Sequence, residues 1–374
     1  MAISFVSDKK TLLGLIQLAL SATSNRSTLP ALEGLLFRLS DNLLTVCGYD
    51  LEKGVRTIGT VQPLEEGAVI LNAQKVAAII KIFPDADITF KADEKNMVEL
   101  SCGPSKFAIH GLTAEAFPNM PELGGDNGFC ISQSLMKEII GSTCFAVSQL
   151  DTRPILTGEF FHIEDRSITA VALDNYRLAL REEKCCIFDN ENTFSFVVPG
   201  KSLMELQRLL GDNEEMLRVE FTAKYVIFKV GDTVLFSRLL EGEYLDYKRA
   251  IPAQNKIFVR LDRNLFEESV ERASLMVDEK LKTALRCKFV NNELQINCTT
   301  QMGKVNDFLP IKKEGDDLEI GFNNRYLLDA LRACKDDELK ISLSTPFMSM
   351  IIEPAKPSES GSYLYLVLPV KLKD

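Results

Sequence analysis

The segment GLLFRLSDNLLTVC, residues 34–47, decides the fold, because it reads as two apolar strands joined by the polar turn Ser40-Asp41-Asn42. Such a pattern predicts a β-hairpin. The same pattern returns as GEFFHIEDRSITAVA at residues 158–172 and as LRCKFVNNELQIN at residues 285–297. Three hairpins separated by about 125 residues indicate three tandem copies of one module.

The segments around the hairpins repeat in the same order. Each copy opens with an amphipathic helix that follows a capping residue, namely Asp8, Ser132 or Asp262. A strand that runs directly into a second helix comes after the hairpin, and further strands close the copy. The closing strands include residues 97–100, 225–230 and 347–352. The six helices are expected within residues 8–26, 72–84, 133–144, 199–211, 262–276 and 323–335. This order predicts an α+β fold in which each module packs two helices on antiparallel sheet.

Two proline-bearing segments separate the copies. They are FPNMP at residues 117–121 and YLDYKRAIP at residues 244–252. Because proline interrupts regular structure, such segments suit domain boundaries. The predicted modules are residues 1–125, 126–253 and 254–374.

Composition argues against several classes of protein. The chain has 46% hydrophobic and 26% charged residues, with no apolar run long enough to span a bilayer and no secretory signal at its start, so we expect a cytoplasmic protein with no membrane partner. Its nine cysteines are odd in number and never spaced as Cys-x-x-Cys, which disfavours a disulfide framework or a zinc site. No cofactor or metal is expected.

The net charge of −10 disfavours a nucleic-acid partner only if it is evenly spread. The six predicted helices carry thirteen basic residues against eight acidic ones, so the acidity lies elsewhere. A basic helical surface without base-reading groups would attract DNA without regard to its sequence.

No catalytic motif stands out. The two histidines, His110 and His162, fall on predicted strands without a nucleophile motif nearby. The acidic pairs Asp316-Asp317 and Asp336-Asp337 fall in predicted turns, which favours solvated carboxylates over a metal site. We therefore predict a protein that is not an enzyme.

Several motifs together resemble those of the bacterial β sliding clamp family, the processivity subunits of the replicative DNA polymerase. The motifs are Arg26-Ser27-Thr28-Leu29-Pro30, Ala116-Phe117-Pro118-Asn119, Asp174-Asn175-Tyr176-Arg177-Leu178-Ala179, Asp246-Tyr247-Lys248-Arg249-Ala250-Ile251-Pro252, Ile320-Gly321-Phe322-Asn323 and Leu368-Pro369-Val370-Lys371-Leu372. The resemblance covers the whole chain. It implies a head-to-tail homodimer that closes into a ring of six modules around double-stranded DNA and tethers the replicative polymerase, the clamp loader and other clients.

The resemblance also implies a pocket for the short motifs of client proteins, between the second and third modules. The matching positions are Leu156, Leu173, Asn175, Tyr176, Arg177, Leu178, Leu245, Arg249, Ala250, Asn323, Tyr326, Phe347, Ser349, Leu366, Val367, Leu368, Pro369, Val370, Lys371 and Leu372. Without the resemblance, the apolar members would be read as ordinary core. The chain departs from the family pattern in Leu173-Asp174-Asn175-Tyr176, where Thr-Asp-Gly-His is more usual, and at Leu245, where proline is common.

Two further sets of residues follow from the resemblance. The DNA-binding set is Arg26, Gln149, Arg153, Lys201, Lys280 and Lys282, and the dimer-interface set is Phe107 and Ile109 against Leu275 and Met276. Two other functions stay open on sequence alone: a clamp-like interaction scaffold that is not loaded on DNA, and a hydrolase that uses His110 or His162.

Overall fold

The computed structural model describes residues 2–24, 26–121, 127–150, 152–184, 187–188, 193–278, 283–356, 358 and 360–372. The chain forms two compact units, which are considered separately. Unit 1 comprises Met1–Ser134 and Arg208–Leu239, and unit 2 comprises Leu135–Gln207 and Leu240–Asp374.

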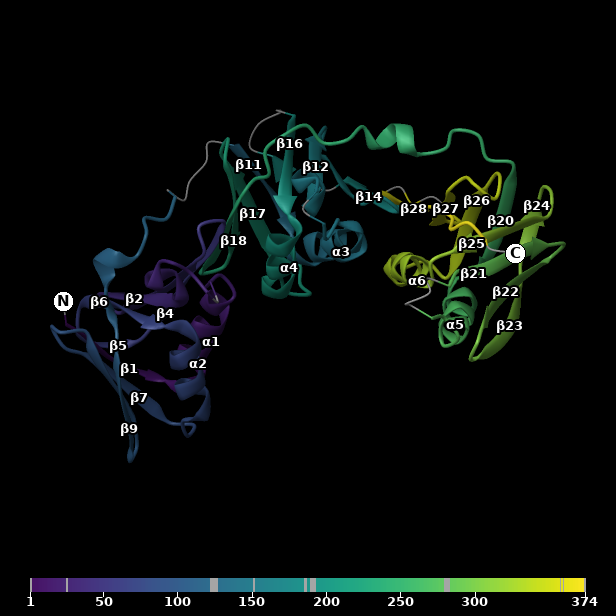
Figure 1. Ribbon diagram of the computed structural model, residues 1–374. Coiled ribbons are helices and arrows are strands. Elements are labelled where there is room, and N and C mark those ends of the chain that lie inside the picture. Colours follow the sequence, from purple (N-terminus) through teal and green to yellow (C-terminus); the bar gives the residue numbers. More distant parts are fainter. Residues whose placement is uncertain are drawn as a thin grey trace. The chain divides into compact units, whose positions relative to one another are not determined.

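Unit 1 contains helices α1 (Lys9–Leu20) and α2 (Ala73–Ile82), which lie side by side (Figure 1). Its first antiparallel sheet has the order β5 (Gln62–Glu65), β1 (Ile3–Asp8), β7 (Asp87–Ala92), β8 (Met97–Cys102), β9 (Ser105–His110). Its second runs β10 (Leu112–Thr113), β6 (Gly67–Asn72), β2 (Gly34–Ser40), β3 (Leu43–Tyr49), β4 (Lys53–Thr60), β19 (Thr233–Arg238), β18 (Tyr225–Val230), β17 (Met216–Phe221), β11 (Asn127–Ser132). One buried apolar cluster joins the two helices to both sheets.

Unit 2 repeats this plan. Its nine-stranded sheet has the order β16 (Phe194–Pro199), β12 (Gly158–Glu164), β13 (Ser167–Leu173), β14 (Arg177–Lys184), β28 (Gly361–Val367), β27 (Met350–Pro354), β26 (Glu338–Leu343), β20 (Ile257–Asp262), β24 (Lys312–Glu314). Its four-stranded sheet runs β23 (Gly303–Pro310), β22 (Glu293–Thr300), β21 (Leu285–Val290), β25 (Leu318–Phe322). Helices α5 (Arg263–Ser274) and α6 (Asn324–Ala333) pack together in this unit. Helices α3 (Gln133–Thr143) and α4 (Gly200–Leu209) span the unit limits, and a two-residue strand β15 covers Ile187–Phe188.

The three predicted hairpins and the six predicted helices are confirmed, and polar caps fix where helices begin. The Asp8 carboxylate accepts the Thr11 N–H at 2.8 Å, and the Asp262 carboxylate accepts the Leu265 N–H at 2.9 Å. A side-chain acceptor at this position satisfies an N–H group that the helix leaves without a partner.

Two expectations were wrong. Each copy opens with a strand (β1, β11 or β20) that leads into the first helix, rather than with the helix itself. The predicted strand over residues 347–352 begins only at Met350, because Phe347 lies in a turn with its side chain 78% exposed.

Strand pairing joins one copy of the repeat to the next. The third strand of the first hairpin meander, β4, pairs antiparallel with β19, the closing strand of the second copy. In the same way β14 pairs antiparallel with β28, the closing strand of the third copy. The equivalent strands that remain, β9 and β23, each pair on one side only within the described chain, with β8 and β22.

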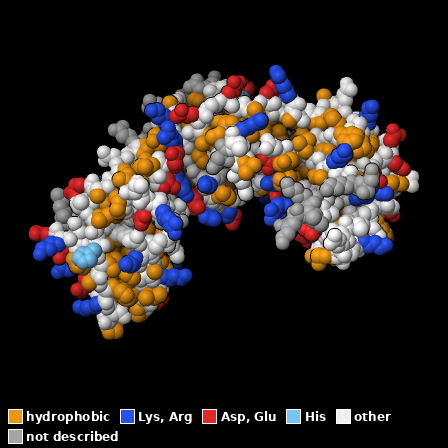
Figure 2. All heavy atoms as spheres, in the orientation of Figure 1, with side chains coloured by type: hydrophobic (Ala, Val, Ile, Leu, Met, Phe, Trp, Pro, Cys, Tyr) orange, Lys and Arg blue, Asp and Glu red, His pale blue; other side chains and the backbone are white. Residues whose placement is uncertain are grey.

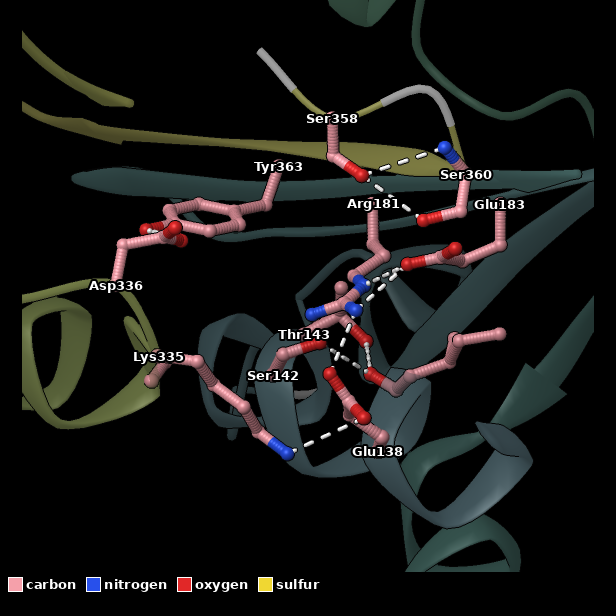
Figure 3. Close-up of polar contacts among 12 residues, drawn as sticks. Glu138, Ser142, Thr143, Arg181, Glu183, Lys335, Asp336, Ser358, Ser360 and Tyr363 are labelled. Atoms are coloured by element: carbon pink, nitrogen blue, oxygen red, sulfur yellow. Dashed lines mark hydrogen bonds and ion pairs between the residues drawn. The ribbon is translucent and has the colours of Figure 1, made fainter. Parts of the chain in front are cut away.

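A buried ion network connects α3, β14 and the end of α6 in unit 2 (Figure 3). The Arg181 guanidinium contacts the carboxylates of Glu138 and Glu183, each at 2.6 Å, and Lys335 reaches Glu138 at 3.2 Å. The Arg181 side chain is 11% exposed and that of Glu183 is 7% exposed. Because a buried charge without a partner is costly, the network fixes how these elements pack.

Burial favours the protonated form of one carboxyl group, that of Glu159. Glu159 on β12 is fully buried, and its Oε1 lies 2.5 Å from the Thr143 hydroxyl, which also donates to the Ile139 carbonyl at 2.7 Å. A hydroxyl has one hydrogen, so both contacts are satisfied only if Glu159 donates its own proton to Thr143. Burial raises the pKa of Glu159 to about 8.

We predict that Glu159→Gln removes a pH dependence of stability. Below the ordinary pKa of 4.5 both states are protonated, and between 4.5 and about 8 only the unfolded chain ionises. The free energy of unfolding of the parent chain therefore falls as pH rises through this window, by up to about 1.4 kcal/mol per pH unit. Urea denaturation followed by circular dichroism at pH 5 to 8 should show this slope in the parent and in the exposed control Glu164→Gln, but not in Glu159→Gln. Equal slopes in all three chains would contradict it.

Candidate functional site

A tight turn between β13 and β14 presents an aromatic side chain to solvent. The Asp174 carboxylate accepts the backbone N–H groups of Tyr176 at 2.7 Å and Arg177 at 3.0 Å. A carboxylate that accepts N–H groups two and three residues ahead mimics a backbone turn. Tyr176 is consequently held in place while it stays 53% exposed, and its ring stacks on that of Tyr326 with centroids 5.6 Å apart.

Arg177 links this turn to α6. Its guanidinium contacts the carboxylates of Asp174, at 3.1 Å, and Asp329. It also lies 4.7 Å from the centre of the Tyr326 ring, a distance at which a cation is attracted to an aromatic face. Asn323 begins α6 by accepting the Tyr326 N–H at 3.2 Å, so cap and cation together orient the Tyr326 ring.

The C-terminal segment crosses the same surface. The Leu368 N–H donates to the Tyr176 carbonyl at 2.8 Å, and the Val370 N–H donates to the Gly321 carbonyl at 2.8 Å. A Cβ atom at Gly321 would lie 2.6 Å from the Val370 carbonyl oxygen, so this close approach requires glycine. Residues 368–372 are therefore held beside the aromatic pair.

The structure separates the predicted client-pocket residues by exposure. Exposed members are Asn175, Tyr176, Leu245, Arg249, Ala250, Phe347, Leu368 and Lys371, and partly exposed members are Asn323, Tyr326, Pro369, Val370 and Leu372. The buried members are Leu156, Leu173, Arg177, Leu178, Ser349, Leu366 and Val367. Four of these, Leu156, Leu173, Leu178 and Leu366, form one apolar cluster, so they support the surface from below. We call the exposed and partly exposed members the client surface.

Several residues around this surface were not foreseen. Asp329 and Phe145 contact Arg177 from positions distant in sequence, and no local pattern points to them. A cavity of about 630 Å³ is lined by Tyr247 and Lys248, from the segment that also carries Leu245 and Arg249. Its lining shares no residue with the predicted set.

The predicted DNA-binding residues that are described are all exposed. They are Arg26, Gln149, Arg153 and Lys201, whereas Lys280 and Lys282 lie outside the described residues. In unit 2 the loop containing Gln149 and Arg153 reaches the start of α4, because a Cβ atom on Gly200 would lie 3.0 Å from Val147 and 3.3 Å from the Thr157 carbonyl oxygen. Lys201 is the next residue after Gly200, so Gln149, Arg153 and Lys201 lie in the same region of unit 2.

The helices differ in how much of their positive charge is neutralised. On α5 and α6, Arg263 pairs with Glu267, Arg272 with Asp307 and Arg332 with Glu271. Helices α1 and α2 instead carry four lysines and no acidic residue. On the face seen in Figure 2, basic and acidic side chains are interspersed rather than segregated.

The four predicted interface residues lie beside the unpaired sheet edges. Phe107 and Ile109 are on β9, half-buried against the core of unit 1, with the Phe107 ring 5.5 Å from that of Phe83. Leu275 follows α5 and is 78% exposed, whereas Met276 is half-buried. A Cβ atom on Gly303, the first residue of β23, would lie 3.7 Å from the Met276 sulfur.

One histidine has neighbours that could suggest nucleophilic chemistry. On the open surface of β12 and β16, His162 Nδ1 lies 2.8 Å from Ser195 Oγ and Nε2 lies 3.4 Å from Glu164 Oε2. Acyl transfer also needs N–H groups that converge on the developing oxyanion. Strand backbone directs its N–H groups in the plane of the sheet toward neighbouring strands, so these positions do not supply them.

The described residues contain no group of His, Cys, Asp and Glu side chains suited to a metal ion. Asp317 is held by Lys313 at 3.0 Å, and Asp336 accepts a hydrogen bond from the Tyr363 hydroxyl at 2.9 Å. No described helix is long and apolar enough to cross a membrane.

Family models match almost the whole chain. Those for the N-terminal, central and C-terminal domains of the DNA polymerase III beta subunit match residues 3–121, 130–246 and 248–371. The beta sliding clamp of Halalkalibacterium halodurans is 31% identical over 98% of this chain and 99% of its own length. That of Bacillus subtilis is 30% identical over the same shares.

Solved structures agree with these matches. The DNA polymerase sliding clamp from Bacillus subtilis superimposes with a TM-score of 0.95 at 29% identity, over all of both chains. A sliding clamp from Pseudomonas aeruginosa bound to griselimycin gives a TM-score of 0.92 at 27% identity, again over all of both chains. The chain therefore belongs to the bacterial β sliding clamp family, the non-catalytic subunits of DNA polymerase III that act as clamps on DNA and make the polymerase processive.

Proposed function

We propose that two copies of this chain close head to tail into a ring around duplex DNA. The observation that carries the proposal is the strand pairing between successive modules, β4 with β19 and β14 with β28. Continued once more, the rule pairs β23 of one copy with β9 of the next. A head-to-tail contact of this kind either closes into a ring or forms a filament. The resemblance to the clamp family favours a ring of two chains. Each chain would contribute three modules, with module boundaries near residues 125 and 253.

The repeat also implies a register for the contact. Thr233 pairs with Thr57, and Leu235 pairs with Val55. Ser105 and Phe107 occupy the same positions after the β8–β9 turn as Thr233 and Leu235 occupy after the β18–β19 turn. On the other strand, Val305 and Asp307 of β23 occupy the positions of Val55 and Thr57 of β4. The seam would therefore pair Phe107 with Val305 of the second copy. Unpaired strand edges favour such an addition.

The apolar side chains near both edges support the same contact. Phe107 and Ile109 would come beside Val305 and Met276 of the second copy, and Leu275 would lose its exposure. Met302 and Phe308, which were not foreseen, flank this region and are 86% and 69% exposed. Interfaces bury apolar side chains of this size at their centres.

We predict a disulfide between two copies when Lys106→Cys and Asn306→Cys are combined in one chain. The implied register makes these residues direct cross-strand partners, within the distance that a disulfide spans. Non-reducing electrophoresis after mild oxidation should show a covalent dimer. The combination Ala108→Cys with Asn306→Cys is the matched control, because it is displaced by two residues. Equal yields from both pairs, or cross-linking of neither, would reject this seam.

The proposed ring would meet DNA through its helices and the DNA-binding set. The four lysines of α1 and α2, with Arg26, Gln149, Arg153, Lys201, Lys280 and Lys282, would contact phosphates without reading bases. Such contacts are independent of sequence and permit sliding. The place of action would be the bacterial cytoplasm.

We further propose that clients bind the client surface with short apolar motifs. Its exposed Tyr176, Phe347 and Leu368 offer anchors, and the Arg177 contacts hold the aromatic pair in one conformation. Large side chains on a rigid support contribute most of the energy in peptide recognition. The polymerase, the clamp loader and other proteins with clamp-binding motifs would share this surface.

We predict that Phe347→Ala weakens binding of the clamp-binding peptide of the cognate polymerase by at least about fivefold, the effect of losing one such anchor. Truncation after Val367, where β28 ends, should abolish binding and leave the ring intact. Calorimetric titration measures both, with Leu64→Ala, an exposed leucine of unit 1, as the control. Unaltered affinity in the truncated chain would exclude this surface.

A second function is a clamp-like scaffold that binds clients without being loaded on DNA. The neutralised arginines of α5 and α6 favour it, because they reduce the positive charge available to phosphates. Loading on DNA by the cognate clamp loader separates the two functions.

A further inference from the structure

Unit 1 contains a cavity of about 570 Å³ that none of the surfaces above includes. Its floor is the outer face of β2, β3 and β4, where the register aligns two rows of side chains. One row is Leu36, Cys47 and Arg56, and the other is Arg38, Thr45 and Ile58. Residues 114–121, which follow the first module's last strands, form the opposite wall.

Two arginines, Arg38 and Arg56, line this cavity without a counterion from the part of the chain that the structure describes. The Arg56 Nε is buried and has no hydrogen-bond partner, and no ion pair is found for Arg38 or Arg56 among the described residues. Cys47 lies between them, but burial raises the pKa of its thiol to about 12, so it stays neutral. Glu115, the one carboxylate among the described lining residues, accepts a hydrogen bond from the Thr113 hydroxyl.

The rest of the lining is largely apolar. Phe117 is 8% exposed and belongs to a buried cluster with Leu36, and Met120 packs against that cluster. Pro118 and Pro121 complete this wall. A ligand that neutralised the arginines would therefore also bury apolar surface.

We propose that this cavity binds an extended peptide segment in which a carboxylate side chain stands beside an apolar one. The guanidinium groups of Arg38 and Arg56 would take the carboxylate, and Ile58, Phe117 and Met120 would take the apolar side chain. Guanidinium pairs with a carboxylate through two parallel N–H donors, and the side chains of Arg38 and Arg56 both line the cavity. A free inorganic anion would leave the apolar wall unused, which favours a peptide.

The site is distinct from the client surface. By the alignment of the hairpins, the positions of Arg38 and Arg56 correspond to His162 and Leu180 in the second copy. In the third copy the corresponding residues are Lys288 and Asn306, and Lys288 pairs with Glu319 at 3.0 Å. A pair of arginines at these two positions is thus particular to the first module. The inference shares no residue with the proposed seam or client surface, so each can fail without the others.

The test is ¹³C-methyl-methionine NMR of the full chain, with Met120 assigned through Met120→Leu. The probe peptide is Ac-Leu-Glu-Leu-Glu-NH₂, and Ac-Leu-Gln-Leu-Gln-NH₂ is its neutral counterpart. We expect the acidic peptide to shift the Met120 resonance saturably and the neutral one to bind at least about tenfold more weakly. Arg38→Gln and Arg56→Gln should each weaken binding to a similar extent, and the exposed control Lys91→Gln should not.

Three outcomes of the peptide titrations on the parent chain would overturn the proposal. They are an unmoved Met120 resonance, equal affinity for the two peptides, and saturation of the same shift by inorganic phosphate at lower concentration, which would indicate a small-anion site. Arg38 is an exposed side chain, so its variant tests the site even if Arg56→Gln does not fold. Phe347→Ala should leave the Met120 shift unchanged, and loss of the shift in that variant would trace it to the client surface.

Discussion

Strand pairing across module junctions is the constraint on which the rest of the molecule depends. In the first and second copies of the repeat, the third strand of the meander pairs with the closing strand of the following copy, which covers both of these edges. An open edge exposes a row of backbone donors and acceptors. Among the described residues, the closing strand and the third meander strand that stay without such a partner are β9 and β23, and apolar side chains accompany both. The proposed ring would give β9 and β23 the strand partners that they lack within one described chain.

The same backbone plan carries different surface chemistry in each copy. The outer sheet face bears Arg56 in the first copy and Leu180 at the corresponding position of the second. Helices α1 and α2 keep their lysines without acidic neighbours on the same helix, whereas the arginines of α5 and α6 pair with carboxylates. Along each strand, buried apolar side chains alternate with exposed ones, and the buried ones maintain the fold of the module. The residues at the exposed positions can therefore differ between copies.

Local pattern predicted the repeat well, because hairpin turns, helix caps and alternating apolar residues act over a few positions. It missed the opening strands, since a six-residue strand directly before a helix cap merges with the helical pattern. It also extended a strand over Phe347, because an apolar residue usually indicates burial, whereas the Phe347 side chain is exposed. The contacts of Arg177 with Asp329, of Glu159 with Thr143, and of the residues around the Arg56 cavity depend on tertiary pairing, so no local pattern could reveal them.

Topological retention on DNA tests the central claim most directly. The chain is loaded by its cognate clamp loader onto a nicked circular duplex, separated from free protein by gel filtration, and followed after the circle is cut by a restriction enzyme. A closed ring that holds DNA by encirclement should stay on the intact circle and leave soon after the DNA is linearised. Equal retention on circular and linear DNA, or failure to load at all, would contradict the ring.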